Sequence, residues 1–184
     1  MTPAEVLGAI ARAAGAGTFA IVGAVARNAW APPRATTDID LAVSAAPPLL
    51  VTLEQTLGSL GYRCVRRQQA DPADPLPDIL VFRSQVAEPR QVDLLVAKTA
   101  FEVEVLRRAV TVQMGGTALP VATPEDLVIY KLIANRPRDR DDIRAVARTQ
   151  QRAGRSIDWG HVDRWVKYWG LADRLSALRR ELEE

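Results

Sequence analysis

The chain has 184 residues, of which 48% are hydrophobic and 25% are charged, and its formal net charge is +2. This length and composition fit a folded globular protein and exclude a largely disordered chain. Apolar runs are short, so no membrane-spanning segment is expected, and a single cysteine, Cys64, excludes an internal disulfide and a cysteine-based zinc site.

The first half of the chain alternates between predicted helices and strands. Residues 3–15 have the spacing of an amphipathic helix and lack the features of a secretory signal, so a cytoplasmic location is expected. An exposed loop is expected over residues 68–78, which contain two Asp-Pro steps. The other elements predicted here are helices at 23–30 and 48–60 and strands at 18–22, 38–43, 62–67, 79–83 and 91–96.

The second half is predicted to be mostly helical. A helix over 101–110 precedes a hairpin that turns at Gly115-Gly116, and Thr123 caps a helix that begins with proline and two acids. Helices are then expected over 137–153 and twice within 158–184. This order predicts an α+β protein, with a mixed-sheet core over residues 1–122, flanked by helices, and a helical carboxy-terminal extension over 123–184.

The strand at 38–43 carries Asp38 and Asp40, which share one face because strand side chains alternate. Asp93 lies on the polar face of the strand at 91–96. If the two strands are neighbours, three carboxylates converge, and such an all-oxygen ligand set suits Mg²⁺ or Mn²⁺. The alternative is a solvated strand end beside an unrelated charge, because a lone Asp-x-Asp is common.

Upstream residues have the pattern of a phosphate site. Gly23 joins a predicted strand to a helix, where free backbone amides and the helix dipole favour an anion and glycine permits close approach. Arg27 falls one turn into the helix and Arg34 just before the strand at 38–43, and either would face phosphate or form a surface salt bridge. A further surplus of basic residues over 131–184 would attract phosphates, or would simply lie on solvated helix faces.

These motifs together resemble the polymerase-β-type nucleotidyltransferase superfamily. The stretch Ile21-Val22-Gly23-Ala24, a spacer and Arg34-Ala35-Thr36-Thr37-Asp38-Ile39-Asp40-Leu41 match its signature, and Asp93 matches its third carboxylate. Residues 123–143 are similar to AbiEii-like toxins and related minimal nucleotidyltransferases. The resemblance covers about residues 19–145.

The resemblance implies a Mg²⁺-dependent transfer of a nucleotide from an NTP such as ATP, with Asp38, Asp40 and Asp93 as metal ligands and catalytic residues. Nucleotide-binding positions would be Gly23, Ala24, Arg27, Arg34, Thr37 and Lys131. Asp139 and Asp142 share a helix face and would orient the lysine or the acceptor. Their alternative is a helix-start charge cluster with Arg138, Arg140 and Arg144.

The implied acceptor is a tRNA or a protein, and the implied partner is the cognate protein of a toxin–antitoxin pair. Ala24 departs from the family pattern, in which glycine or serine stands at that position, so it keeps the backbone amide but supplies no hydroxyl. A catalytically inactive interaction module is therefore one alternative. A nucleotidyltransferase that acts on a small molecule, as in antibiotic-modifying relatives, is another.

Two further features of the carboxy-terminal part are interpreted as structural. The only histidine, His161, is expected to be solvated or to cap a helix near Trp159. Trp159, Trp165 and Trp169 have helical spacing, which is more typical of core packing than of base stacking.

Overall fold

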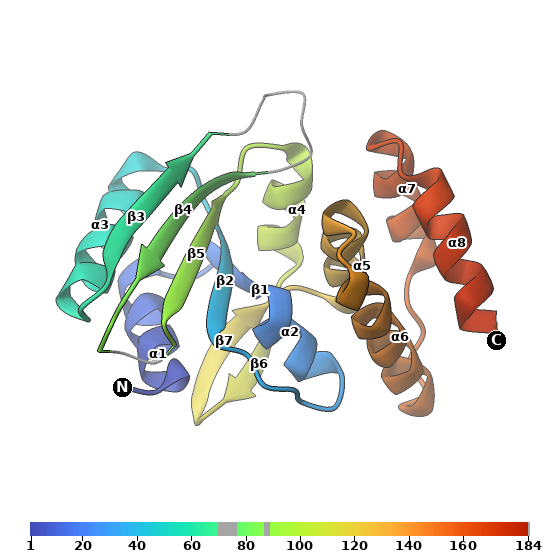
Figure 1. Cartoon of the computed structure of the whole chain (residues 1–184), viewed down its shortest axis with the longest axis horizontal. Coiled ribbons are helices and arrows are strands. Elements are labelled where there is room, and N and C mark those ends of the chain that lie inside the picture. Colours follow the sequence, from blue (N-terminus) through green and yellow to red (C-terminus); the bar gives the residue numbers. More distant parts are fainter. Residues whose placement is uncertain (70–76, 87–88, 184) are drawn as a thin grey trace. The chain divides into compact units, whose positions relative to one another are not determined.

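A computed structural model describes residues 1–69, 77–86 and 89–183 of the chain. Part of the loop expected over residues 68–78, namely 70–76, lies outside the described residues. Figure 1 shows the elements in chain order. Helices are α1 (Pro3–Ala14), α2 (Gly23–Trp30), α3 (Pro47–Ser59), α4 (Ala100–Arg108), α5 (Pro124–Ala134), α6 (Pro137–Arg152), α7 (Trp159–Tyr168) and α8 (Ala172–Glu183). Strands are β1 (Phe19–Val22), β2 (Asp38–Val43), β3 (Arg63–Gln68), β4 (Asp78–Arg83), β5 (Gln91–Val96), β6 (Val110–Met114) and β7 (Thr117–Val121).

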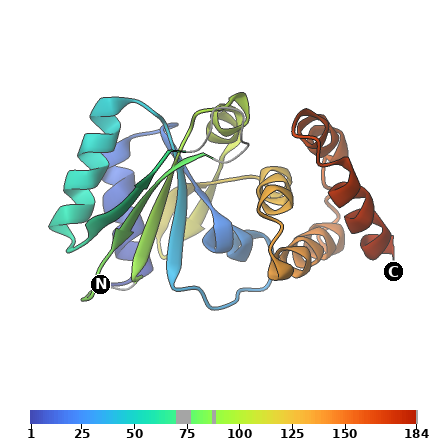
Figure 2. The same ribbon diagram turned by 45° about the horizontal axis from the view of Figure 1, so that its top comes forward.

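The described strands form one mixed sheet in the order β3-β4-β5-β2-β1-β7-β6. Strand β2 pairs in parallel with β5 and antiparallel with β1. Helices α1 and α3 lie side by side on one face of this sheet and α4 lies on the other, as Figures 1 and 2 show. The α+β prediction, with a mixed-sheet core flanked by helices, is confirmed.

Local sequence signals explain where most elements begin and turn. Thr2 forms a capping box with Glu5 at the start of α1, and Thr123 caps α5 through a bond from the backbone amide of Asp126. Gly115 and Gly116 both have positive φ, at 57° and 81°, as a two-residue hairpin turn between β6 and β7 requires. The helix predicted over 101–110 ends earlier, at Arg108, because the β-branched run from Val110 starts β6.

The contacts divide the chain into two compact units. We call them the sheet unit (residues 1–26 and 35–122) and the helical unit (residues 27–34 and 123–184). In the sheet unit, Ile39, Leu41 and Leu94 are fully or almost fully buried on one face of the sheet. The helical unit is built on contacts of α5 with α6 and α7 and of α7 with α8. The domain limits expected from the sequence stay a prediction.

In the described part of the chain, no helix has both the length and the apolar character that crossing a membrane requires.

Candidate active site

Asp38 and Asp40 lie on β2 and share one face of the sheet. Burial alternates along the strand, with Ile39 and Leu41 buried and both aspartates half-buried. This is the period of two that a strand imposes on its side chains. The apolar positions anchor the strand in the core, and the same alternation directs the two carboxylates to the opposite face.

Asp93 lies beside Asp40 on the neighbouring strand. The parallel register of β2 and β5 pairs Asp40 with Asp93, and it pairs Asp38 with Gln91. Residues directly opposite in a sheet share a face. The structure therefore brings the three predicted carboxylates onto one face of two adjacent strands.

Gln91 holds the carboxylate of Asp93. Its amide nitrogen Nε2 donates to both oxygens of Asp93, at 3.0 and 3.1 Å. Burial raises the pKa of Asp93 above its ordinary value, and the negative charge of Asp38 raises it further, although the bonds from Gln91 act against this shift. Asp93 thus carries its negative charge at an energetic cost that a cation would relieve.

Gly23 lies on the other side of Asp40. Val22, the last residue of β1, pairs with Asp40, and α2 begins at the next residue. Gly23 has a φ of +61°, and a Cβ there would lie only 1.9 Å from Oδ2 of Asp40. Glycine is therefore required for two reasons: its positive φ, and the close approach of Asp40, which leaves no room for a Cβ.

The first turn of α2 offers backbone amides close to Asp40. The first N–H groups of a helix have no partner within the helix, and the helix dipole makes this end attractive to phosphate. Gly23 and Ala24 are the first two residues of α2. Asp40 consequently lies between an amide-rich helix start and a second carboxylate, Asp93.

Thr37 and Asp38 complete the described site at the start of β2. The hydroxyl of Thr37 donates to Oδ1 of Asp38 at 3.1 Å, and Thr37 is exposed. This bond orients one oxygen of the Asp38 carboxylate. The hydroxyl of Thr37 is predicted from the sequence to contact nucleotide, and its exposure leaves it accessible.

The donor set fits a divalent ion that is shared with a nucleotide. Carboxylate oxygens are the ligands that Mg²⁺ and Mn²⁺ prefer. Within residues 1–69, 77–86 and 89–183, no three His, Cys, Asp or Glu side chains form a group that could hold an ion. Mg²⁺ is commonly bound by only one or two carboxylates together with substrate phosphates, which is the kind of partial set that β2 and β5 present.

The other predicted site residues belong to the helical unit, where Asp142 of α6 is the common partner of the three basic ones. The ammonium group of Lys131 donates to Asp142 at 2.6 Å and to Asp139 at 3.0 Å. Arg27 and Arg34 also reach Asp142, with closest distances of 3.1 and 2.9 Å. We call these five residues the Asp142 network.

Charge compensation defines the Asp142 network. Burial raises the pKa of Asp142, but hydrogen bonds from Arg34 and Lys131 outweigh that effect and lower the pKa to about 2. Burial likewise opposes the shift at Asp139, whose pKa is nevertheless lowered by bonds from Arg136 and by the charge of Lys131. Lys131 is itself only 4% exposed, so its ammonium group is held by two carboxylates.

Two of the three alternative partners of these acids, Arg140 and Arg144, bind Glu181. Arg140 donates to Glu181 at 2.7 Å and Arg144 donates to the same carboxylate at 3.0 Å. Asp139 instead accepts from the backbone amide and guanidinium of Arg136 as well as from Lys131. Both acids hold the ammonium group of Lys131 in the helical unit, and their orienting role stays a prediction.

A known protein family matches the part of the chain that contains these residues. The family described as nucleotidyl transferase AbiEii toxin, type IV TA system, matches residues 5–149. The chain belongs to the AbiEii nucleotidyltransferase family. The match includes Gly23, the three aspartates and the Asp142 network, and it confirms the resemblance inferred from the sequence. This chain is accordingly a nucleotidyltransferase by family.

Solved structures of nucleotidyltransferases share the fold. The antibiotic-resistance factor ANT(2″)-Ia in solution is 16% identical and matches with a TM-score of 0.58 over 96% of this chain and 95% of that one. ANT(2″)-Ia in complex with adenylyl-2″-tobramycin is 14% identical, with a TM-score of 0.54 over 97% and 95%. A protein from Thermotoga maritima that is assigned as a nucleotidyltransferase is also 14% identical, with a TM-score of 0.52 over 78% and 93%. No curated protein sequence matches this chain.

The environment of His161 in this AbiEii-family chain differs from the expectation. The expected solvated or capping role is wrong, because His161 is 5% exposed and its Nε2 lies 2.7 Å from Oδ1 of Asp126. Asp126 is fully buried and also accepts from the hydroxyl of Thr123. Among the tryptophans, Trp165 is buried, as core packing predicts, whereas Trp159 and Trp169 are half-buried.

Three residues near Asp93 were not predicted. Gln91 precedes Asp93 by two positions on the same strand, so strand alternation could have revealed it. Arg83 donates to Gln91 at 3.0 Å, and the positive charges of Arg83 and Arg66 act on Asp93. These two arginines come from β4 and β3, and only the pairing of the strands brings them near Asp93.

Proposed function

We propose that this chain transfers a nucleoside monophosphate from an NTP to a hydroxyl group of a macromolecule, with Mg²⁺ or Mn²⁺ at Asp38, Asp40 and Asp93. One observation carries the proposal. Asp40 is flanked directly by the glycine-led start of α2 on one side and by Asp93 on the other. A phosphate-binding helix start and a carboxylate pair are thereby adjacent on one face of the sheet.

In this proposal, different residues of the sheet unit bind the triphosphate, hold the metal ions and accept the proton. The backbone amides of Gly23 and Ala24 hold the triphosphate at the start of α2. Bound metal ions would polarise the reacting phosphate and neutralise the leaving pyrophosphate. Asp93, beside Asp40, receives the proton of the acceptor hydroxyl, and Gln91 keeps its carboxylate in place.

Lys131 and the arginines of the Asp142 network keep their predicted nucleotide role as part of the proposal. Three cations of the network, Arg27, Arg34 and Lys131, meet two carboxylates, and Arg136 adds another positive charge at Asp139. These residues together carry more positive than negative charge. Such a surplus attracts phosphate.

We infer an acceptor of the tRNA or protein class and a role as the toxin of a toxin–antitoxin pair. The AbiEii family description supports the toxin role. An antitoxin protein is then the expected partner, and the cytoplasm, where NTPs and these acceptors occur, is the expected location. The preferred base, including a preference for ATP, is left to experiment.

A small-molecule acceptor is the second candidate. ANT(2″)-Ia, which has been solved with adenylyl-2″-tobramycin, matches nearly the whole of this chain in fold. An aminoglycoside is a polycation, so this reading predicts an acceptor site that tolerates positive charge. A third candidate, an inactive interaction module, follows from Ala24, which lacks the hydroxyl of a serine.

The test is a transfer assay with separate acceptors. The protein is incubated with Mg²⁺, each labelled NTP in turn, and total tRNA, cell lysate protein or tobramycin. We expect label in the tRNA or protein fraction, and none with Asp40→Asn. Transfer to tobramycin alone would replace the first candidate by the second. Absence of transfer to every acceptor would overturn both and leave the interaction module.

A further inference from the structure

The carboxylate face of the sheet continues past Asp93 onto β4 and β3. Val81 of β4 pairs with Asp93, and Arg66 of β3 pairs with Val81. In the next row on the same face, Arg83 of β4 pairs with Gln91. The register therefore places two arginines on the extension of the face that carries the aspartates.

Both arginines are exposed and act on the carboxylate site. The guanidinium groups of Arg66 and Arg83 each exert an electrostatic effect on Asp93. Arg83 also donates through Nε to the side-chain oxygen of Gln91, whose amide nitrogen donates to Asp93. A hydrogen-bonded chain thus runs from the exposed cation to the carboxylate.

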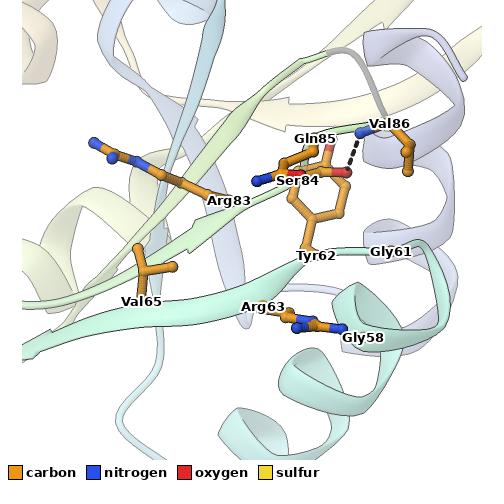
Figure 3. Close-up of a pocket in the computed structure, with 9 residues that line it drawn as sticks. All are labelled: Gly58, Gly61, Tyr62, Arg63, Val65, Arg83, Ser84, Gln85 and Val86. Atoms are coloured by element: carbon orange, nitrogen blue, oxygen red, sulfur yellow. Dashed lines mark hydrogen bonds between the residues drawn. The ribbon is translucent and has the colours of Figure 1, made fainter.

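A hollow of about 680 Å³ adjoins Arg83. Figure 3 shows Arg83, Tyr62 and Ser84 among the residues that line it, with the ring of Tyr62 directed toward Ser84. Tyr62 is almost fully buried and donates to the backbone oxygen of Pro89, which fixes this side of the hollow. The hollow lies where β4 ends and β3 begins, at the sheet edge where β2 and β5 start.

The geometry of the transfer reaction indicates from which side the acceptor approaches the carboxylates. In a phosphoryl displacement the attacking and leaving oxygens lie roughly in line on opposite sides of the phosphorus. With the triphosphate at the start of α2, beyond β1, the leaving pyrophosphate lies on the β1 side of Asp40. The acceptor hydroxyl must then approach over Asp93, from the side of β4 and β3.

We propose that Arg66 and Arg83 form an acceptor-side phosphate subsite, which binds a phosphate group of the molecule whose hydroxyl is modified. The inference rests on the proposed function for its direction. Two guanidinium groups suit phosphate, which they bind through paired N–H donors. They repel a polycation such as an aminoglycoside, so this subsite favours a nucleic-acid strand or a phosphorylated small molecule as acceptor.

The hollow beside Arg83 offers space for the rest of the acceptor molecule. Its lining includes Arg63 and Gln85 as well as Arg83, so polar groups are available around the entering chain. Arg83 stands at the border between the hollow and Gln91. A nucleic-acid strand that lies in the hollow would pass Arg83 before its terminal hydroxyl reaches Asp93.

The test measures binding of two phosphate probes at several salt concentrations. One probe is a labelled single-stranded RNA oligonucleotide with a free 3′ hydroxyl, and the other is a mononucleoside 5′-monophosphate. The variants are Arg66→Gln, which leaves the Arg83–Gln91 bond intact, and the double variant with Arg83→Gln. Arg67→Gln is the matched control, because Arg67 is an exposed arginine of the same strand that pairs with Glu54 of α3 on the opposite face.

We expect the double variant to bind the RNA at least about tenfold more weakly and to lose about 0.7 of the logarithmic salt slope per arginine. Arg66→Gln should show about half of that change in slope, and Arg67→Gln none. Weakening with the RNA alone identifies a strand as the ligand, and equal weakening with the mononucleotide identifies a small phosphorylated acceptor. The proposal is overturned if the double variant binds both probes like the wild type, or if the wild type binds neither.

A second measurement separates this outcome from failure of the proposed function. The thermal melt with Mg²⁺ and NTP reports the carboxylate site, and Arg66→Gln should still show the stabilisation by Mg²⁺ and NTP together. Loss of RNA binding with an intact nucleotide shift supports the subsite. A wild type that shows no nucleotide shift contradicts the proposed function, whereas the RNA measurement still decides the subsite by itself.

Discussion

The two units of this chain hold their acidic clusters in opposite ways. In the sheet unit, Asp93 shares a face with two other aspartates, its described hydrogen bonds come from the neutral amide of Gln91, and its pKa is raised. In the helical unit, Asp142 is surrounded by cations, and its pKa is lowered to about 2.

The carboxylates of the sheet unit need a bound cation to offset their charge, whereas Asp142 is offset by lysine and arginine side chains of the chain itself. Carboxylates that gather on one face repel each other, and a divalent ion relieves this repulsion. A buried acid that is already paired with lysine and arginine gains little from any ion, but its loss leaves buried positive charge without a partner. The carboxylates of the sheet unit should therefore govern catalysis, and the loss of Asp142 from the second cluster should act mainly on stability.

The largest effect is expected from Asp40→Asn on catalysis. We expect the rate of nucleotide transfer to fall at least about a thousandfold, because a ligand for the ions that stabilise the transition state is removed. Stability should change by less than about 1 kcal/mol, since asparagine has nearly the same shape. The checks are single-turnover transfer of labelled NTP and urea unfolding. A variant with more than a tenth of the wild-type rate would contradict the division of roles.

The converse change is Asp142→Asn, for which we expect a loss of about 3–5 kcal/mol in the free energy of unfolding. The side chain of Asp142 is only 5% exposed and pairs with Lys131, Arg27 and Arg34. Asp141→Asn is the matched control, because the neighbouring carboxylate is 77% exposed and its loss should cost no more than about 0.5 kcal/mol. Equal urea midpoints for the two variants would refute a structural role for Asp142.

The pH dependence of the free energy of unfolding tests the ion pairs of Asp142 further. The pKa of Asp142 is lowered in the folded chain, so its contribution is present above the unfolded pKa and is lost as the pH falls. With an unfolded value near 3.9, the loss should occur between about pH 4 and pH 2. Asp142→Asn should remove this part of the acid dependence, and an unchanged profile would count against the pairing.

A smaller effect of opposite sign is expected from Asp93→Asn. The pKa of Asp93 is raised in the folded chain, so its relative stabilising effect is present below the unfolded pKa and is lost as the pH rises through the folded pKa. Without metal, the variant should therefore be slightly more stable than the wild type at pH 7 and equal to it near pH 3. Urea unfolding at both pH values, with EDTA present, measures this. Destabilisation at pH 7 would show that the charge of Asp93 is already compensated.

The smallest effect is expected from Ala24→Ser. A serine hydroxyl at the start of α2 adds one donor for a phosphate oxygen, and the net contribution of a typical hydrogen bond is about 0.5–1.5 kcal/mol. We expect NTP binding to tighten by up to about tenfold, as measured by calorimetric titration in Mg²⁺. No gain in affinity, together with no transfer by either protein, would favour the inactive interaction module.

Several features of the two units could be predicted from the sequence because they depend on local sequence patterns. The alternation around Asp38 and Asp40 fixed their shared face, and Thr123 with Pro124 marked the start of α5. Gly23 was predicted as the join between β1 and α2, and the structure adds its contact with Asp40. Each of these depends on neighbouring residues and on backbone geometry that a sequence pattern encodes.

Other features depend on contacts between distant parts of the chain. The common role of Asp142 requires α6, α5 and residues 27–34 to meet, and the buried pair of His161 with Asp126 requires α7 to pack on α5. Arg66 and Arg83 were missed because their position depends on the register of three strands, which includes an irregularity between Cys64 and Arg66. No local pattern fixes a register of this kind.

The most direct test of the central claim is the thermal unfolding of the wild type, Asp40→Asn and Asp141→Asn with Mg²⁺ alone, NTP alone and both together. A ligand that binds only the folded chain at a hundred times its Kd adds about 2.7 kcal/mol of stability, which raises Tm by several degrees in a chain of this size. We expect this rise only with Mg²⁺ and NTP together, in the wild type and Asp141→Asn but not in Asp40→Asn. An equal rise in Asp40→Asn, or no rise in the wild type with any NTP, would contradict the assignment of Asp38, Asp40 and Asp93 as the metal–nucleotide site.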